Sequence, residues 1–234
     1  MIAVTEFLQT LGPQMLQRTY EHVYLTFLSL IIATAIALPL GVYLTRTRWP
    51  ALASGVLGLA GVIQTVPSLA MVAYAVTLLA LLKTTGAPVP TIGSFPAIVA
   101  LVLYGLLPIL RNTYTGIRQV DPAIIEVARG MGMTARQILL RVELPLSLAI
   151  IMAGVRIATV WTIGVAALGG LIGAGGLGDL IMRGLRTVHV GYLLAGSVPA
   201  SLLALLSDWV LGRVERWLTP PGLRIQPSAA EKGV

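Results

Sequence analysis

The sequence predicts an all-α membrane protein, a bundle of about five transmembrane helices. The first observation is composition: hydrophobic residues make up 56% of the 234 residues and charged residues only 11%. A soluble globular domain carries about 25% charged residues, because water must wet its surface. The second observation is that the apolar residues form long runs. Together they exclude a soluble enzyme, a disordered chain and a disulfide-rich secreted module.

A helix needs about 20 apolar residues to cross about 30 Å of hydrocarbon. Five stretches meet this requirement, and they are 22–44, 55–82, 92–110, 146–172 and 191–211. They lack the alternation of barrel strands, so they are predicted to be helices. The second stretch is long enough to bend, and Pro67 predicts where it bends. Residues 22–211 are therefore the predicted transmembrane domain.

The flanking segments have different expected roles. In residues 1–21 the apolar residues recur at helical spacing, which predicts a separate interfacial helix; they are Phe7, Leu8, Leu11, Met15 and Leu16. The tail 212–234 is predicted to be unstructured from Thr219 on, because prolines and a glycine follow. Inside the bundle, small residues at four-residue spacing predict close helix packing; they include Ala33, Ala37 and Gly41.

Basic residues are divided unequally between the segments that connect the spans. Segments 45–54, 111–145 and 212–234 hold eleven, whereas the other side holds four. Lys and Arg collect on the cytoplasmic side of membrane proteins. This bias predicts an outside N-terminus, a cytoplasmic C-terminus and a cytoplasmic loop 111–145. It also accounts for the net charge of +7 without nucleic acid as a partner.

The loop 111–145 carries signals for a short helix. Asp121 is a good N-cap and Pro122 fits the first helical position. The run Gly130-Met131-Gly132 ends such a helix, because glycine tolerates the left-handed conformation.

A second short helix is predicted directly after the first. Thr134 opens it, and Gln137 three residues on completes a capping box. Pro145 marks the step into the fourth span. The pattern predicts a rigid two-helix elbow under the membrane, suited to docking on a cytoplasmic partner.

This loop resembles the EAA loop of permease subunits of ABC importers. The resemblance rests on spaced positions, which are Glu126, Val127, Ala128, Gly132, Val142, Leu144 and Pro145. Val127 stands where the family usually has alanine, and Val142 where it usually has isoleucine. In that family the loop is the coupling region that sits in a groove of the ATPase subunit. The resemblance therefore implies ATPase-coupling roles for Glu126, Ala128, Gly132, Leu144 and Pro145.

Four further stretches are similar to the osmoprotectant branch of this family, whose members transport glycine betaine, choline, carnitine and related quaternary amines. They are residues 64–69, 107–114, 151–156 and 173–178. Methionine importers share the coupling loop and the glycine-rich run, so 64–69 and 107–114 do most to distinguish the branches. A permease for methionine or another amino acid is the alternative.

The resemblance also implies the surroundings of the chain. These are the permease fold of type I ABC importers, the bacterial inner membrane and its lipid, a second permease chain (identical or paralogous), two ABC ATPase subunits and an extracytoplasmic binding protein. The chain itself binds no cofactor, since ATP and Mg are used by the ATPase. The sequence agrees, because neither Lys83 nor Lys232 lies in a G-x-x-x-x-G-K-[ST] motif. Hydrolysis of ATP therefore falls to a separate subunit, and this chain is not an enzyme.

Polar residues inside the spans are candidates for the translocation path. Gln64, Thr65 and Ser68 surround Pro67 and either line the path or bond a neighbouring helix. Arg156 lies deep in the fourth span, where an unpaired charge is costly. It either pairs with Asp208 or backbone carbonyls, or lines the path and holds a solute carboxylate.

Trp161 lies five residues beyond Arg156 and is a candidate for cation–π contact with a quaternary ammonium group. Gly173, Gly175 and Gly178 spell G-x-G-x-x-G, but they follow a membrane helix rather than a strand, so they do not indicate a dinucleotide site. Together with Gly176 they are interpreted as a flexible break and a candidate outer gate. His22 and His189 are isolated, and no metal site is predicted.

Two other classes of membrane protein are alternatives. A secondary transporter would carry paired ionisable groups and inverted repeats, and the sequence has one deep arginine and no convincing repeat. A channel or scaffold would need no ATPase.

Overall fold

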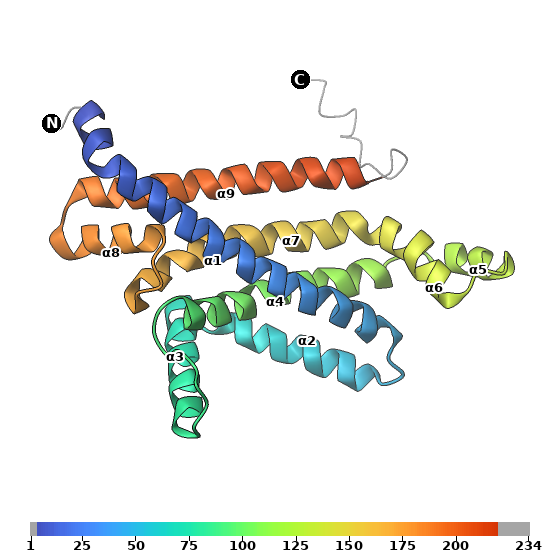
Figure 1. Ribbon diagram of the computed structural model, residues 1–234. Helices are drawn as coiled ribbons and strands as arrows, with labels where there is room; N and C mark the ends of the chain where they lie inside the picture. Colours follow the sequence, from blue (N-terminus) through green and yellow to red (C-terminus); the bar gives the residue numbers. More distant parts are fainter. Residues whose placement is uncertain (1–3, 220–234) are drawn as a thin grey trace.

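The computed structural model describes residues 4–219, and every regular element in that range is helical (Figure 1). The elements are α1 (Val4–Arg46), α2 (Pro50–Thr65), α3 (Ser68–Thr84), α4 (Ser94–Arg118), α5 (Pro122–Gly130), α6 (Ala135–Ile138), the π-helical η1 (Leu139–Glu143), α7 (Leu144–Ala166), the 3₁₀-helical η2 (Ala167–Ile172), α8 (Leu177–Thr187) and α9 (Val190–Leu218). Four helical segments in the described range are long and apolar enough to cross a membrane, or five if the bent pair α2–α3 is one span. The predicted fold class is confirmed.

Helix α4 lies at the centre of the bundle, with α1 on one side and α7 on the other (Figure 1). Small residues let these helices approach closely. A Cβ atom on Gly41 of α1 would lie 2.8 Å from the Cβ of Thr113 in α4. One on Gly154 of α7 would lie 2.7 Å from the carbonyl oxygen of Pro108. Ala33 and Ala37 are fully buried, so the predicted stripe on the first span packs against the core.

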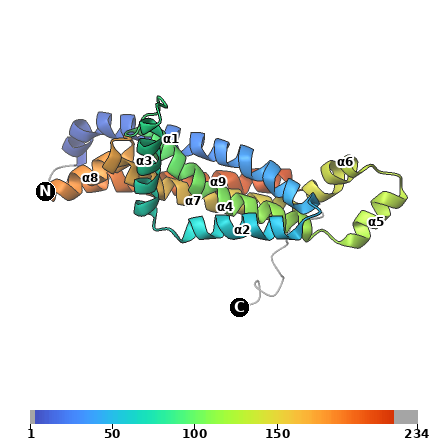
Figure 2. The same cartoon turned by 90° about the horizontal axis from the view of Figure 1, so that it is seen from below.

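The second predicted span is sharply bent. Helices α2 and α3 meet at 108° around Pro67, so α3 runs across the long axis of the bundle (Figures 1 and 2), and its Met71, Val72 and Ala75 pack against α4. The residue before a proline avoids the helical region, and Val66 is indeed extended, with ψ of 126°. Its carbonyl oxygen accepts a hydrogen bond from the Tyr104 hydroxyl. Pro67 thus marks the bend as predicted, but 55–82 is two helices rather than one continuous span.

The N-terminal segment is not a separate interfacial helix, because α1 runs without interruption from Val4 to Arg46. Two of its apolar residues pack against other helices of the bundle. Leu11 is buried, and with Met15 it belongs to a core cluster contributed mainly by α8 and α9; the other buried members are Leu177, Leu180 and Ala195. Packing of this face on α8 and α9 explains why the helix continues. Leu16 is exposed.

The fourth span is longer than predicted. The second short helix, α6, continues through η1 into α7, so one helical segment extends from Ala135 to Ile172. The Leu144 N–H bonds to the carbonyl of Leu139, five residues back, which is the wider turn of a π-helix. This turn accommodates Pro145, whose missing N–H would interrupt a regular α-helix. The predicted elbow is therefore α5 joined to the end of a long helix.

The fifth span, α9, ends at Leu218, beyond the predicted end at residue 211. Helix α8 was not predicted. It packs Leu177, Leu180 and Gly184 inward, mainly against α9, and carries the charged Asp179. The predicted unstructured tail, apart from Thr219, lies outside the described residues.

Candidate coupling and translocation sites

The candidate coupling loop, residues 111–145, is shaped by local capping. The Asp121 carboxylate accepts a hydrogen bond from the N–H of Ala123, at 2.9 Å, and Pro122 begins α5. At the other end Gly132 has a φ of +81°, which favours glycine. Thr134 and Gln137 bond reciprocally, at 2.8 and 3.3 Å, as in the predicted capping box. These bonds give the loop a defined shape without any partner protein.

Helix α5 projects from one end of the bundle (Figures 1 and 2). Ala128 is buried, whereas Glu126 is exposed and Val127 and Met131 keep 63% and 70% of their surface exposed. The exposed side of α5 therefore carries apolar side chains next to a carboxylate. Glu126, Ala128 and Gly132 thus belong to the projecting segment.

Leu144 and Pro145 lie elsewhere, at the start of α7, where both are half-buried. Beside them the Glu143 side chain, only 2% exposed, forms an ion pair with Arg46 at the end of α1. Arg118 and Arg129 line a cavity of about 290 Å³ next to this pair. Sequence reasoning missed the pair, which fastens the base of the coupling loop to the bundle.

The candidate path residues do not form one cluster. At the bend between α2 and α3, Thr65 is exposed and its hydroxyl donates to the Val62 carbonyl of its own helix. Gln64 and Ser68 are half-buried there. Arg156 and Trp161 lie on α7 and line a different pocket of about 390 Å³. The bend and this pocket are therefore separate places in the described chain.

Arg156 is paired with acidic side chains, which agrees with the predicted alternative that it pairs with Asp208. Its Nε and Nη2 donate to the two carboxylate oxygens of Asp208, at 2.9 and 3.0 Å. Its Nη1 donates to Glu215, at 3.0 Å, a partner that sequence reasoning missed. Gly212 lies between the two acids on α9, and a Cβ there would be in ordinary van der Waals contact with the Arg156 guanidinium, at 3.4 Å from its carbon.

The glycine run 173–178 lies at the end of the bundle opposite α5 (Figure 1). It is a closely packed turn. Gly173, Gly175 and Gly176 have φ values of +71°, +81° and +73°. A Cβ on Gly178 would lie 1.9 Å from the Ala167 carbonyl oxygen, so only glycine fits.

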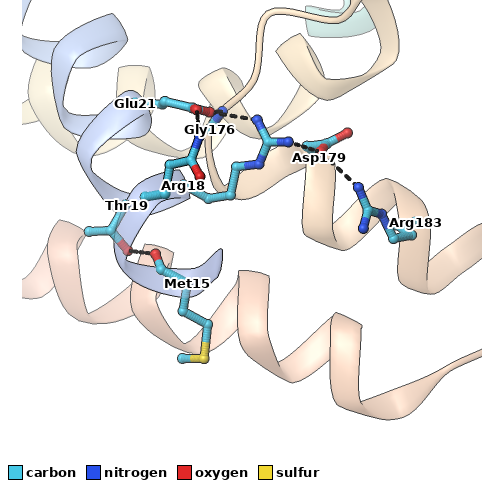
Figure 3. A network of polar contacts seen from close by, with 8 residues as sticks. Met15, Arg18, Thr19, Glu21, Gly176, Asp179 and Arg183 are labelled. Atoms are coloured by element: carbon cyan, nitrogen blue, oxygen red, sulfur yellow. Dashed lines mark hydrogen bonds and ion pairs between the residues drawn. The ribbon is translucent and has the colours of Figure 1, made fainter. Parts of the chain in front are cut away.

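An ionic network fastens this turn to α1 (Figure 3). The Gly176 N–H donates to the Glu21 carboxylate, at 2.9 Å. Arg18 bridges Glu21 and Asp179 at 2.7 and 2.8 Å, and Arg183 lies 3.5 Å from Asp179. The network joins α1, the glycine turn and α8 into one unit.

His22, beside this network, is fully buried, with its Nε2 placed 3.0 Å from the Ile163 carbonyl oxygen. Its Nδ1 has no hydrogen-bond partner among residues 4–219. A Cβ on Gly176 would lie 3.1 Å from this nitrogen, so the turn packs directly on the ring.

The chain matches known proteins over nearly its whole length. Residues 15–220 match the family described as binding-protein-dependent transport system inner membrane component. The choline transport system permease protein of Bacillus subtilis is 44% identical over 221 residues, which cover 94% of this chain and 96% of that protein. The glycine betaine/carnitine/choline transport system permease protein of the same organism is also 44% identical, over 93% and 94% of the two chains.

Among solved structures, the MetNI methionine ABC transporter in an inward facing conformation has a similar fold. The TM-score is 0.78 at 24% identity, and the match covers 88% of this chain and 96% of that one. At this identity the similarity concerns the fold alone.

The first prediction concerns the buried ion pair. Arg46→Met leaves the Glu143 carboxylate buried without its partner, and we expect the thermal midpoint of the purified protein to fall by roughly 5 to 10 °C. The double variant Arg46→Met with Glu143→Met removes both charges, and we expect it to recover most of the loss. A double variant no more stable than Arg46→Met would show that the pair is not the cause.

The second prediction compares two glycines. Gly173→Ala and Gly175→Ala both place alanine at positive φ, but only at Gly175 would the new Cβ meet Glu21, 2.6 Å from a carboxylate oxygen. Displacing Glu21 breaks its bonds to Gly176 and Arg18. We therefore expect the free energy of unfolding of Gly175→Ala to be lower than that of Gly173→Ala by about 1–3 kcal/mol. When Glu21→Ala is added to both variants, this difference in stability between them should vanish. Equal thermal midpoints in the wild-type background would contradict the role of the network.

Proposed function

The chain belongs to the binding-protein-dependent transport system inner membrane component family, and from this premise we propose that it is the permease subunit of an ABC importer for compatible solutes. The solutes are glycine betaine, choline, carnitine and similar quaternary amines. The observation that carries the proposal is the 44% identity over more than nine-tenths of the chain to permeases named for these solutes.

Membership of the family implies partnership with a separate ATPase, a substrate-binding protein and a second permease chain. We propose two permease chains and two ATPase subunits with one binding protein. ATP and Mg are used in the ATPase subunits. The N-terminus lies outside and the C-terminus in the cytoplasm, an arrangement that the distribution of arginine supports.

Transport proceeds by alternating access. ATP-driven closure of the ATPase subunits moves α5, whose exposed face carries Glu126 and Val127. Because α6, η1 and α7 form one continuous segment, this movement reaches Arg156 and Trp161 through packed helix rather than through a soft loop. The path passes the α7–α9 face and the bend at Gln64, Thr65 and Ser68.

The outer gate in this proposal is the glycine turn, with Gly173, Gly175, Gly176 and Gly178. Its attachment to α1 through Glu21 supports the role, because a turn held by one helix moves with that helix. The gate is then a rigid element that shifts as a unit, rather than a flexible break.

The third prediction tests the solute class. The reconstituted complex with its binding protein is given labelled glycine betaine, choline, carnitine and methionine. We expect ATP-dependent uptake of at least one quaternary amine and none of methionine. Uptake of methionine alone, or uptake at full rate without ATP, would contradict the proposal.

The fourth prediction tests the coupling loop. Glu126→Lys reverses the charge on the exposed face of α5, and Gly132→Asp adds a side chain at a φ of +81°. We expect either variant to reach the membrane at normal levels and to lose most solute uptake, at least about tenfold. Arg48→Gln, a charge change in the segment between α1 and α2, is the matched control and should transport normally. Normal uptake by both loop variants would count against the role of α5.

A further inference from the structure

The pocket between α7 and α9 has walls of mixed chemistry. It is lined by Ala153, Arg156, Ile157, Val160, Trp161 and Asp208. Its volume of about 390 Å³ is within the usual range for small-molecule sites. Trp161 keeps 46% of its surface exposed, although the residue lies in the middle of a membrane segment. The pocket therefore offers an aromatic face, aliphatic walls and a charged edge.

The charges at this edge do not cancel. One guanidinium, that of Arg156, is shared by two carboxylates, those of Asp208 and Glu215. These three groups therefore sum to one negative charge. Two further cations lie on α9. The Arg213 guanidinium lies 4.6 Å over the Trp209 ring, and Arg216 lines the adjoining cavity with Glu215 but forms no ion pair with either acid within the described range.

This balance changes the role expected for Arg156. Three of its N–H groups already bind carboxylates. A solute carboxylate arriving there would meet two carboxylates of the protein and be repelled. A cation would instead be attracted, and the Asp208 side chain is 42% exposed and available to it.

We propose that this pocket binds the quaternary ammonium group of the solute during translocation. The Trp161 ring supplies a cation–π contact. Asp208, backed by Glu215, supplies the negative charge, while Ala153, Ile157 and Val160 contact the N-methyl groups, which form no hydrogen bonds. Arg156 positions both acids and does not touch the solute. The inference rests on the proposed function and extends it to a named contact site.

The test measures binding to the nucleotide-free permease–ATPase complex without its binding protein. Saturation-transfer NMR follows the methyl protons of choline and of 3,3-dimethylbutan-1-ol, its neutral isostere. We expect choline to bind about tenfold more tightly than the isostere. Trp161→Leu should weaken the binding of choline about fivefold or more. Trp161→Phe should weaken it less, because an aromatic ring remains.

The charge is tested separately. Asp208→Asn should abolish the preference for choline over the isostere. Because Asp208→Asn also disturbs Arg156, a second variant is needed. Glu215→Gln leaves the bidentate pair of Arg156 with Asp208 in place and should reduce the preference for choline over the isostere. Trp217→Leu, on α9 at a position 82% exposed and outside the pocket, is the control and should bind like wild type.

Two outcomes would overturn the inference. One is equal binding of choline and its isostere by the wild type. The other is unchanged choline binding in both Trp161→Leu and Glu215→Gln. If either result is found while the wild type takes up quaternary amines normally, the pocket assignment is wrong and the proposed function stands. If the wild type takes up no quaternary amine, the proposed function itself is contradicted.

Discussion

A chain in lipid must satisfy its own polar groups, and most of this structure follows from that constraint. Several buried hydroxyls bond back to their own helices, as when Thr26 donates to the His22 carbonyl and Thr159 to that of Val155. The buried hydroxyls of Thr113 and Thr162 have no such partner among the described residues. Charged residues find partners on distant helices. Arg156 forms ion pairs with two acids on α9, and Glu143 forms one with Arg46 on α1. Each partner fixes one helix against another.

These attachments fix the helices of the bundle against one another. One long helical segment joins the coupling loop to the pocket at Trp161 and to the glycine turn beyond it. At one end of α1, Arg46 holds Glu143, at the base of that segment. Towards its other end, Glu21 holds the turn. In the proposed alternating access, these connections would carry a displacement of α5 to both ends of the bundle.

Local signals were predictable from the sequence, and long-range pairing was only partly so. The caps at Asp121 and Thr134 depend on residues two or three positions away, and both formed as predicted. The bend at Pro67 followed from the chemistry of proline, but its angle depends on packing with α4. The Arg46–Glu143 pair joins residues 97 positions apart, and no local pattern indicates it. Helix α8 was missed because a glycine-rich run opens it, although Leu177, Leu180 and Gly184 recur at helical spacing and pack mainly against α9.

The central claim is that α5 lies under the membrane against an ATPase subunit, and thiol labelling tests it most directly. The chain has no cysteine, so Val127→Cys introduces a single thiol on the exposed face of α5. The measurement is its labelling by a membrane-impermeant maleimide in right-side-out and inside-out vesicles, with and without the ATPase subunits. We expect labelling only in inside-out vesicles, and protection when the ATPase is bound. Labelling in right-side-out vesicles, or no protection by the ATPase, would contradict the account.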